Sequence, residues 1–114
     1  MNTNEITCVV TPLSQTYADG LQRVELYVCT ECIPSIEKPR PGERVGITFS
    51  TQHGNYEGGL RNNLDQYPYV CPDLRTQLGD KTSLARALRD DGVKPHDRVK
   101  VSVSGTTWTL LGLA

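Results

Sequence analysis

The chain lacks the segments that direct a protein to a membrane. No apolar run in its 114 residues is long enough to cross a bilayer. The first residues, MNTNEITC, have neither the basic start nor the apolar stretch of a signal peptide. We therefore expect a cytoplasmic protein with no membrane partner.

The common catalytic motifs are missing as well. The stretch GNYEGG at 54–59 has no lysine followed by serine or threonine, as a phosphate-binding loop requires. His53 lies near Glu57, but no activated nucleophile accompanies the pair. Cys29 and Cys32 are spaced as a dithiol, yet they end an expected strand beside acids instead of opening a helix. We predict no enzymatic activity, and a catalytic alternative would have to use one of these two pairs.

The chain also has almost no net charge. The formal net charge is −1, with five acids and one base in residues 1–37 and eleven bases and eight acids in residues 38–114. A dedicated nucleic-acid binder usually shows a clustered basic face, which this balance does not provide. With 37% hydrophobic and 22% charged residues, the chain is expected to fold as a single domain, 1–114.

Alternation of apolar and polar residues is what the sequence has in abundance. It predicts an α+β fold: a small β-rich domain of five to six strands, in a sheet or partly closed barrel, with one main helix. We expect a β-hairpin at 5–30, a strand at 44–50, an irregular loop region at 51–79 and a helix-plus-hairpin unit at 80–113. The first strand should end at Pro12.

The last unit allows the most detailed prediction. A helix at 83–89, capped by Asp80 or Thr82, should stop at Gly92. A two-residue turn at Ser104-Gly105 would place Val101 opposite Trp108 and put the apolar partners on one face. The predicted core consists of Val24, Leu26, Val28, Val45, Ile47, Phe49, Leu84, Leu88, Val99, Val101, Val103, Trp108 and Leu110.

Four cysteines suggest a metal site as one alternative. Cys29-x-x-Cys32 has the spacing for two zinc ligands, and Cys8 and Cys71 would complete four. A tight first hairpin would place Cys8 opposite Glu31, within reach of the pair. The competing interpretation is four free thiols, with no cofactor.

Residues 83–111, which include GVKPHDRVKVSVSGTTWTLL, resemble the swapped-hairpin AbrB/MazE-like pattern. In that pattern a short helix is followed by G-V-x-P-G-D-x-V-x-V and a hairpin; His96 stands at the glycine position. Members of the family are commonly dimeric DNA binders and antitoxins. The resemblance therefore implies a homodimer and a nucleic-acid partner, with these candidate contact residues: Arg86, Arg89, Lys94, Arg98 and Lys100.

Tyrosine and arginine, which dominate protein-binding hot spots, occur together in the loop-rich stretch 56–69. We predict a non-catalytic module that binds a protein partner there, as a small regulator or a phage-type inhibitor. The predicted contacts are Tyr56, Arg61, Tyr67 and Tyr69. The alternatives are an AbrB-like nucleic-acid-binding regulator and a small zinc-stabilised domain.

Overall fold

A computed structural model describes residues 3–114 of the chain. In the described residues the strands are β1 (Thr3–Thr16), β2 (Gln22–Val28), β3 (Arg44–Thr51), β4 (Gly54–Asn62), β5 (Pro68–Val70), β6 (Asp73–Thr76), β7 (Lys81–Ser83), β8 (Arg98–Ser104) and β9 (Thr107–Leu113). The 3₁₀ helix η1 spans Thr30–Ser35 and the helix α1 spans Leu84–Asp90.

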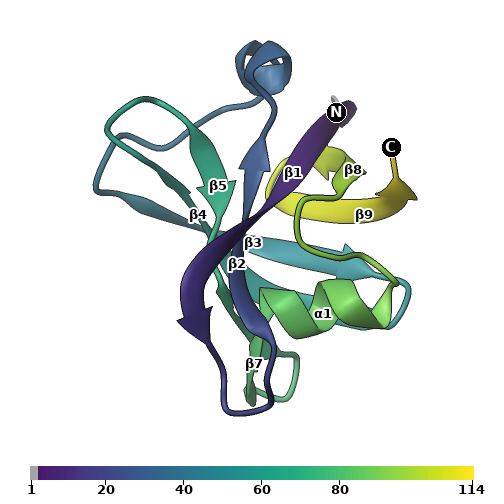
Figure 1. The fold of residues 1–114 in the computed structure, drawn as a ribbon. Helices are drawn as coiled ribbons and strands as arrows, with labels where there is room; N and C mark the ends of the chain where they lie inside the picture. The colour runs from purple at the N-terminus through teal and green to yellow at the C-terminus, as the bar shows by residue number, and fades with distance from the viewer. Residues whose placement is uncertain (1–2) are drawn as a thin grey trace.

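The strands form a closed barrel (Figure 1). The order β3-β9-β8-β1-β2-β5-β4 closes because β4 also pairs with β3, and β6 and β7 continue from β4. On its other edge, β3 joins β9 through a short parallel contact, in which Thr48–Ser50 of β3 meet Thr107–Thr109 of β9. The prediction of a small β-rich domain with one main helix is confirmed. The expected five to six strands were too few, since residues 3–114 contain nine, and the barrel is fully closed.

The long first strand joins the two halves of the barrel. Its N-terminal part pairs with β8 as far as Val9, and its C-terminal part pairs with β2 from Cys8 onward. The strand passes through Pro12, where we expected it to end. A proline is tolerated there because pairing with β8 has already stopped, so its missing N–H breaks no bond on that edge.

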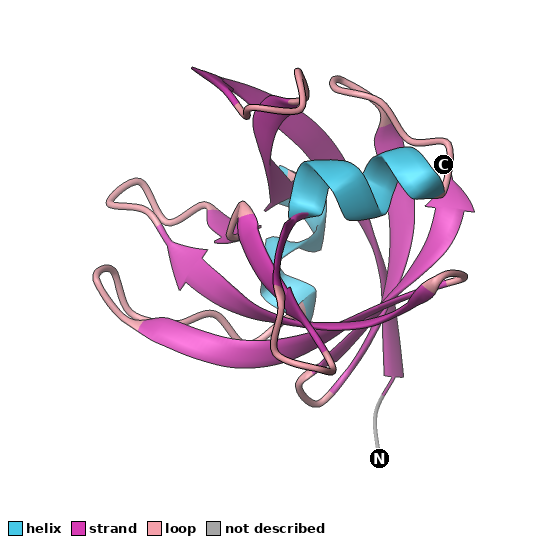
Figure 2. Ribbon diagram, turned by 90° about the horizontal axis from the view of Figure 1, so that it is seen from below, coloured by secondary structure: helices cyan, strands magenta, loops and turns pink. Residues whose placement is uncertain are grey.

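Apolar side chains fill the barrel, and α1 lies across one open end (Figure 2). Of the predicted core, only Val45 is exposed, at 38%; it lies on the part of β3 that β9 does not cover. The helix begins one residue later than expected. Its cap is Ser83, whose Oγ accepts a hydrogen bond from the Arg86 N–H at 3.1 Å, so neither Asp80 nor Thr82 caps it. Gly92 ends it with φ +78°, as expected.

The turn of the last hairpin lies one residue later than expected, which shifts the pairing register by two residues. The turn is Gly105-Thr106, so Trp108 pairs with Val103 instead of Val101. A shift of two residues keeps every side chain on its face, because the side-chain period of a strand is two. Trp108 is therefore still buried, at 2% exposure.

The expectation of an irregular loop at 51–79 is wrong. This stretch contains β4, β5 and β6, and β4 pairs with β3 along its length around the turn Gln52-His53. Glycines at 54, 58 and 59 interrupt the alternation of apolar and polar side chains by which the other strands are recognised. In the described part of the chain, no helix has the length and apolar character needed to cross a membrane.

Candidate binding face on the outside of the barrel

Four side chains from four adjacent strands form a row on the outer surface of the barrel. Tyr27 on β2 pairs with Tyr69 on β5, Tyr69 pairs with Arg61 on β4, and Arg61 pairs with Arg44 on β3. Each points outward, because the adjacent residues of its strand point inward. We call these four residues the tyrosine–arginine row.

The two tyrosines at one end of the row stack on each other. Their ring centroids are 5.0 Å apart, with an interplanar angle of 26°. Partial burial raises the pKa of both phenols, and the negative charge of Glu25 raises it further. Burial also raises the pKa of Glu25, against a hydrogen bond from Tyr27. The stacked pair is therefore a preformed aromatic surface with one carboxyl group at its edge.

The two arginines at the other end carry like charges on directly opposed positions of β3 and β4. Side chains at such positions have their Cβ atoms only about 5 Å apart, and like charges there destabilise a sheet. The ion pairs between residues 3–114 involve neither Arg44 nor Arg61. The folded chain therefore holds two adjacent guanidinium groups that no carboxylate neutralises.

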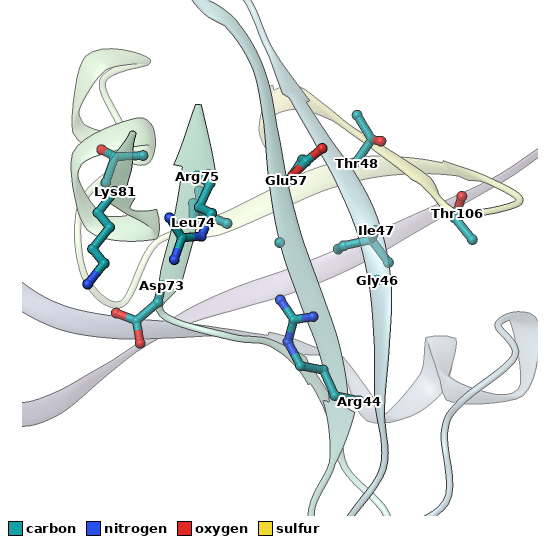
Figure 3. A pocket seen from close by; sticks show the side chains of 12 residues that line it. Arg44, Gly46, Ile47, Thr48, Glu57, Asp73, Leu74, Arg75, Lys81 and Thr106 are labelled. Carbon is teal, nitrogen blue, oxygen red and sulfur yellow. The ribbon is translucent and has the colours of Figure 1, made fainter. Parts of the chain in front are cut away.

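Glycine at position 59 makes room for one of these guanidinium groups. A Cβ at Gly59 would lie 2.3 Å from Nε of Arg44 and 2.6 Å from its Cζ. Figure 3 shows the Arg44 side chain reaching from β3 across β4. Gly46, which pairs with Gly59, leaves the neighbouring position on β3 equally free of side chain. The Arg44 guanidinium thus occupies the space above the bare backbone of Gly59.

Two grooves meet at Arg44. The first, of about 430 Å³, runs from the end of β1 to the arginine pair, and we call it the arginine groove; its charged lining residues are Arg23, Glu25, Arg44, Arg61 and Asp73. The second, of about 760 Å³, lies over β3, β4 and β6, and we call it the glycine groove (Figure 3); its charged lining residues are Arg44, Glu57, Asp73, Arg75 and Lys81. Each groove contains both acids and bases, with three bases against two acids.

Arg23 occupies the far side of the arginine groove. Its guanidinium binds Asp73 at 3.0 Å and Gln15 at 3.1 Å, while its Nε is buried without a hydrogen-bond partner. Cys71 forms part of the groove wall. Burial raises the pKa of its thiol, and the positive charges of Arg61 and Arg44 oppose that rise. Both arginines therefore lie close enough to act on the same buried group.

The structure separates the four predicted partner-binding residues. Arg61 and Tyr69 are adjacent in the row, but Tyr56 points to the inner side of β4 and packs against the core. Tyr67 is 40% exposed in the loop before β5. Tyr27 and Arg44 complete the row and were missed. The detectable signal was the two-residue turn between β3 and β4, from which the pairing of Arg44 with Arg61 follows.

The basic residues proposed for nucleic-acid contact have acidic neighbours. Arg86 binds Asp19 at 2.9 Å, and Lys100 binds Glu5 at 3.1 Å. Ion pairs also join Arg98 to Glu31 and Arg89 to Asp90, both at 3.5 Å. Lys94 lies in the turn before β8, beside α1. These residues do not form a cluster of free positive charge.

The four cysteines do not come together. Cys8 pairs with Val28, not Glu31, because the first hairpin does not turn tightly at Asp19-Gly20 and its register shifts between Pro12 and Thr16. Cys8, Cys29 and Cys32 lie near one another, and burial raises the pKa of both the Cys8 and the Cys29 thiol. Cys71 lies beyond β5, next to β4. Within residues 3–114, no group of three or more potential ligands is placed to hold a metal ion.

His53 has a different acidic partner from the one expected. Its Nδ1 lies 2.5 Å from Oδ1 of Asp91, whose side chain is only 4% exposed, while Glu57 faces outward on β4 beside Arg75. The contact ties the turn between β3 and β4 to the end of α1, which also accepts the Gln52 N–H. This pair therefore fastens the helix to the barrel.

The tyrosine–arginine row and its two grooves can bind a ligand by stacking, by charge-assisted hydrogen bonds and by shape. They offer aromatic area, unneutralised guanidinium groups and a floor of backbone on neighbouring strands. Comparison with protein-family models, curated proteins and solved structures finds no match to this chain.

Proposed function

We propose that the chain is a non-catalytic module that binds a protein partner through the tyrosine–arginine row. The observation that carries the proposal is the alignment of Tyr27, Tyr69, Arg61 and Arg44 across four paired strands. Tyrosine and arginine are the residues most enriched at interface hot spots, where both lose their water on binding. A module of this kind acts as a regulator or inhibitor by covering a functional surface of its partner.

The charges along the grooves favour a protein over a nucleic acid. The arginine groove has three arginines against two carboxylates, and Glu57 adds a further acid in the glycine groove. A phosphate backbone gains its affinity from an uninterrupted positive surface, and the interposed acids reduce that gain. A protein surface carries charges of both signs and can complement a groove that contains both.

Affinity capture with matched variants tests the proposal. Wild-type protein, Arg61→Gln with Tyr69→Ser, and the control Lys94→Gln are each immobilised and exposed to nuclease-treated lysate of the native host cell. Both variants change exposed or partly exposed positions that do not contribute to the core. We expect a partner retained by the wild type and the control and lost from the face variant.

Two results contradict the proposal. One is a partner that all three proteins retain equally. The other is a gel shift of mixed single- and double-stranded DNA at micromolar protein that weakens steeply with salt and disappears in the face variant, since that is the behaviour of a nucleic-acid surface. Light scattering of the wild type separates a third outcome, in which the partner is a second copy of the chain.

A further inference from the structure

We infer that Arg44 and Arg61 form a binding site for one acidic group, the carboxylate or phosphate of a side chain on the partner protein. The inference rests on the proposed function, because it names the chemistry of the partner at the same face. Its physical basis is the pairing of two guanidinium groups at opposed positions with no carboxylate within ion-pair distance among the described residues.

Without a bound anion, the pairing of Arg44 with Arg61 destabilises the folded chain. Two like charges on directly opposed strand positions repel each other. The other arginines of the arginine groove and of α1 show the usual solution, since Arg23 binds Asp73 and Arg86 binds Asp19. An oxyanion bound by both Arg44 and Arg61 would remove the repulsion and gain charge-assisted hydrogen bonds.

The surroundings hold the two groups in place for this purpose. Gly59 leaves the space in which the Arg44 guanidinium lies, and a Cβ there would approach its Nη2 to 2.8 Å. Arg61 lies directly opposite Tyr69, and both arginines act electrostatically on the Cys71 thiol. The guanidinium groups are thus held on one side of the arginine groove, where an incoming oxyanion meets both.

The acids around the pair limit the site to a single anionic group. Glu25 and Asp73 line the same groove, and Asp73 already binds Arg23. Glu57 points outward two positions before Gly59 on β4. A chain of phosphates extending in either direction would meet these carboxylates, whereas one acidic side chain inserted between Arg44 and Arg61 would not.

The test uses the full chain and three probes at constant ionic strength: inorganic phosphate, N-acetylglutamate α-amide, whose single charge is the side-chain carboxylate, and a ten-nucleotide oligothymidylate. The Nε–Hε signals of Arg44 and Arg61 are followed by ¹H–¹⁵N NMR. We expect saturable shifts of both signals with phosphate, with the glutamate probe or with both, which distinguishes a phosphorylated from a carboxylate side chain. Arg61→Gln should weaken binding by roughly tenfold or more, since a hydrogen bond to a charged group contributes about 1.5–3 kcal/mol.

Lys94→Gln is the matched control, because it removes one positive charge from an exposed position outside the row and both grooves. It should leave both affinities unchanged at physiological salt, where distant exposed charges are largely screened. The inference is overturned if neither phosphate nor the glutamate probe gives a saturable shift, if Lys94→Gln weakens their binding as much as Arg61→Gln, or if oligothymidylate binds far more tightly than either. Failure here, combined with loss of the captured partner in the variant that carries Arg61→Gln and Tyr69→Ser, would leave the proposed function standing.

Discussion

Replacing Trp108 by alanine tests the packing of the barrel where it closes. Trp108 is 2% exposed, pairs with Val103 on one side and lies beside Phe49 across the short parallel contact. A large aromatic buries about 150–250 Å², and at about 25 cal/mol per Å² its removal costs about 4–6 kcal/mol. Mutational series for Trp→Ala and Phe→Ala place the cost at about 3–5 kcal/mol.

The assay is chemical and thermal unfolding followed by far-ultraviolet circular dichroism, because Trp108 is the only tryptophan and its loss removes the fluorescence signal. A loss of about 4 kcal/mol corresponds to a fall in Tm of roughly 15 °C for a domain of this size. Leu111→Ala on the same strand is the control, since Leu111 is 49% exposed and its loss should change stability by at most about 0.5 kcal/mol. A loss below about 1 kcal/mol for Trp108→Ala would refute the burial of Trp108 in the barrel.

Three further predictions concern the scaffold. Gly58→Ala should destabilise by about 1–3 kcal/mol in urea unfolding, because its Cβ would lie 2.7 Å from Leu74 Cδ2, whereas Gly46→Ala, which faces open space, should be neutral. Ser83→Ala should cost about 1 kcal/mol, with most of it recovered in Ser83→Asp, since both Ser and Asp accept the cap hydrogen bond. Burial raises the pKa of the Cys8, Cys29 and Cys71 thiols, so the folded chain holds their protons more tightly than the unfolded chain. Stability should be constant below the unfolded thiol pKa near ~8.5 and should fall as pH rises through it, less steeply in Cys8→Ala; urea midpoints that do not change between pH 7 and 10 would contradict this.

Side-chain alternation predicted the inner faces of the long strands because it depends only on local sequence. The alternation predicts one apolar face for the strand that contains Val24, Leu26 and Val28, and all three are buried in the barrel. The predicted faces of the last hairpin are also correct, because a register shift of two residues leaves each side chain on the same face of the sheet. Val45 shows the limit: it points inward, yet it is 38% exposed because β9 does not reach that part of β3.

The stretch 51–79 was not predictable from local patterns. The glycines of β4 occupy inward and outward positions alike, so the strand shows no apolar alternation and little intrinsic preference for extended structure. β5 has only three residues and begins at a proline. Both strands exist because β3 and β2 supply partners for their backbone groups, which is information from distant parts of the chain.

The binding face depends on the same distant pairings. Arg61 and Tyr69 were identified from their residue types alone, and they are adjacent in the structure. Tyr27 and Arg44 belong beside them only because β2 pairs with β5 and β3 pairs with β4. The absence of an acidic partner for Arg44 and Arg61 among the described residues is a property of the folded surface, since several acids lie close to them in the sequence.

Site-specific photo-crosslinking tests the central claim most directly. A benzophenone amino acid replaces Tyr69 in one variant and Lys94, outside the tyrosine–arginine row, in another, and both are irradiated in native host lysate. The account predicts a covalent protein adduct from position 69 that is absent from position 94, and that Arg61→Gln in the same chain reduces. Equal adducts from the two positions, or crosslinking from position 69 to nucleic acid alone, would contradict it.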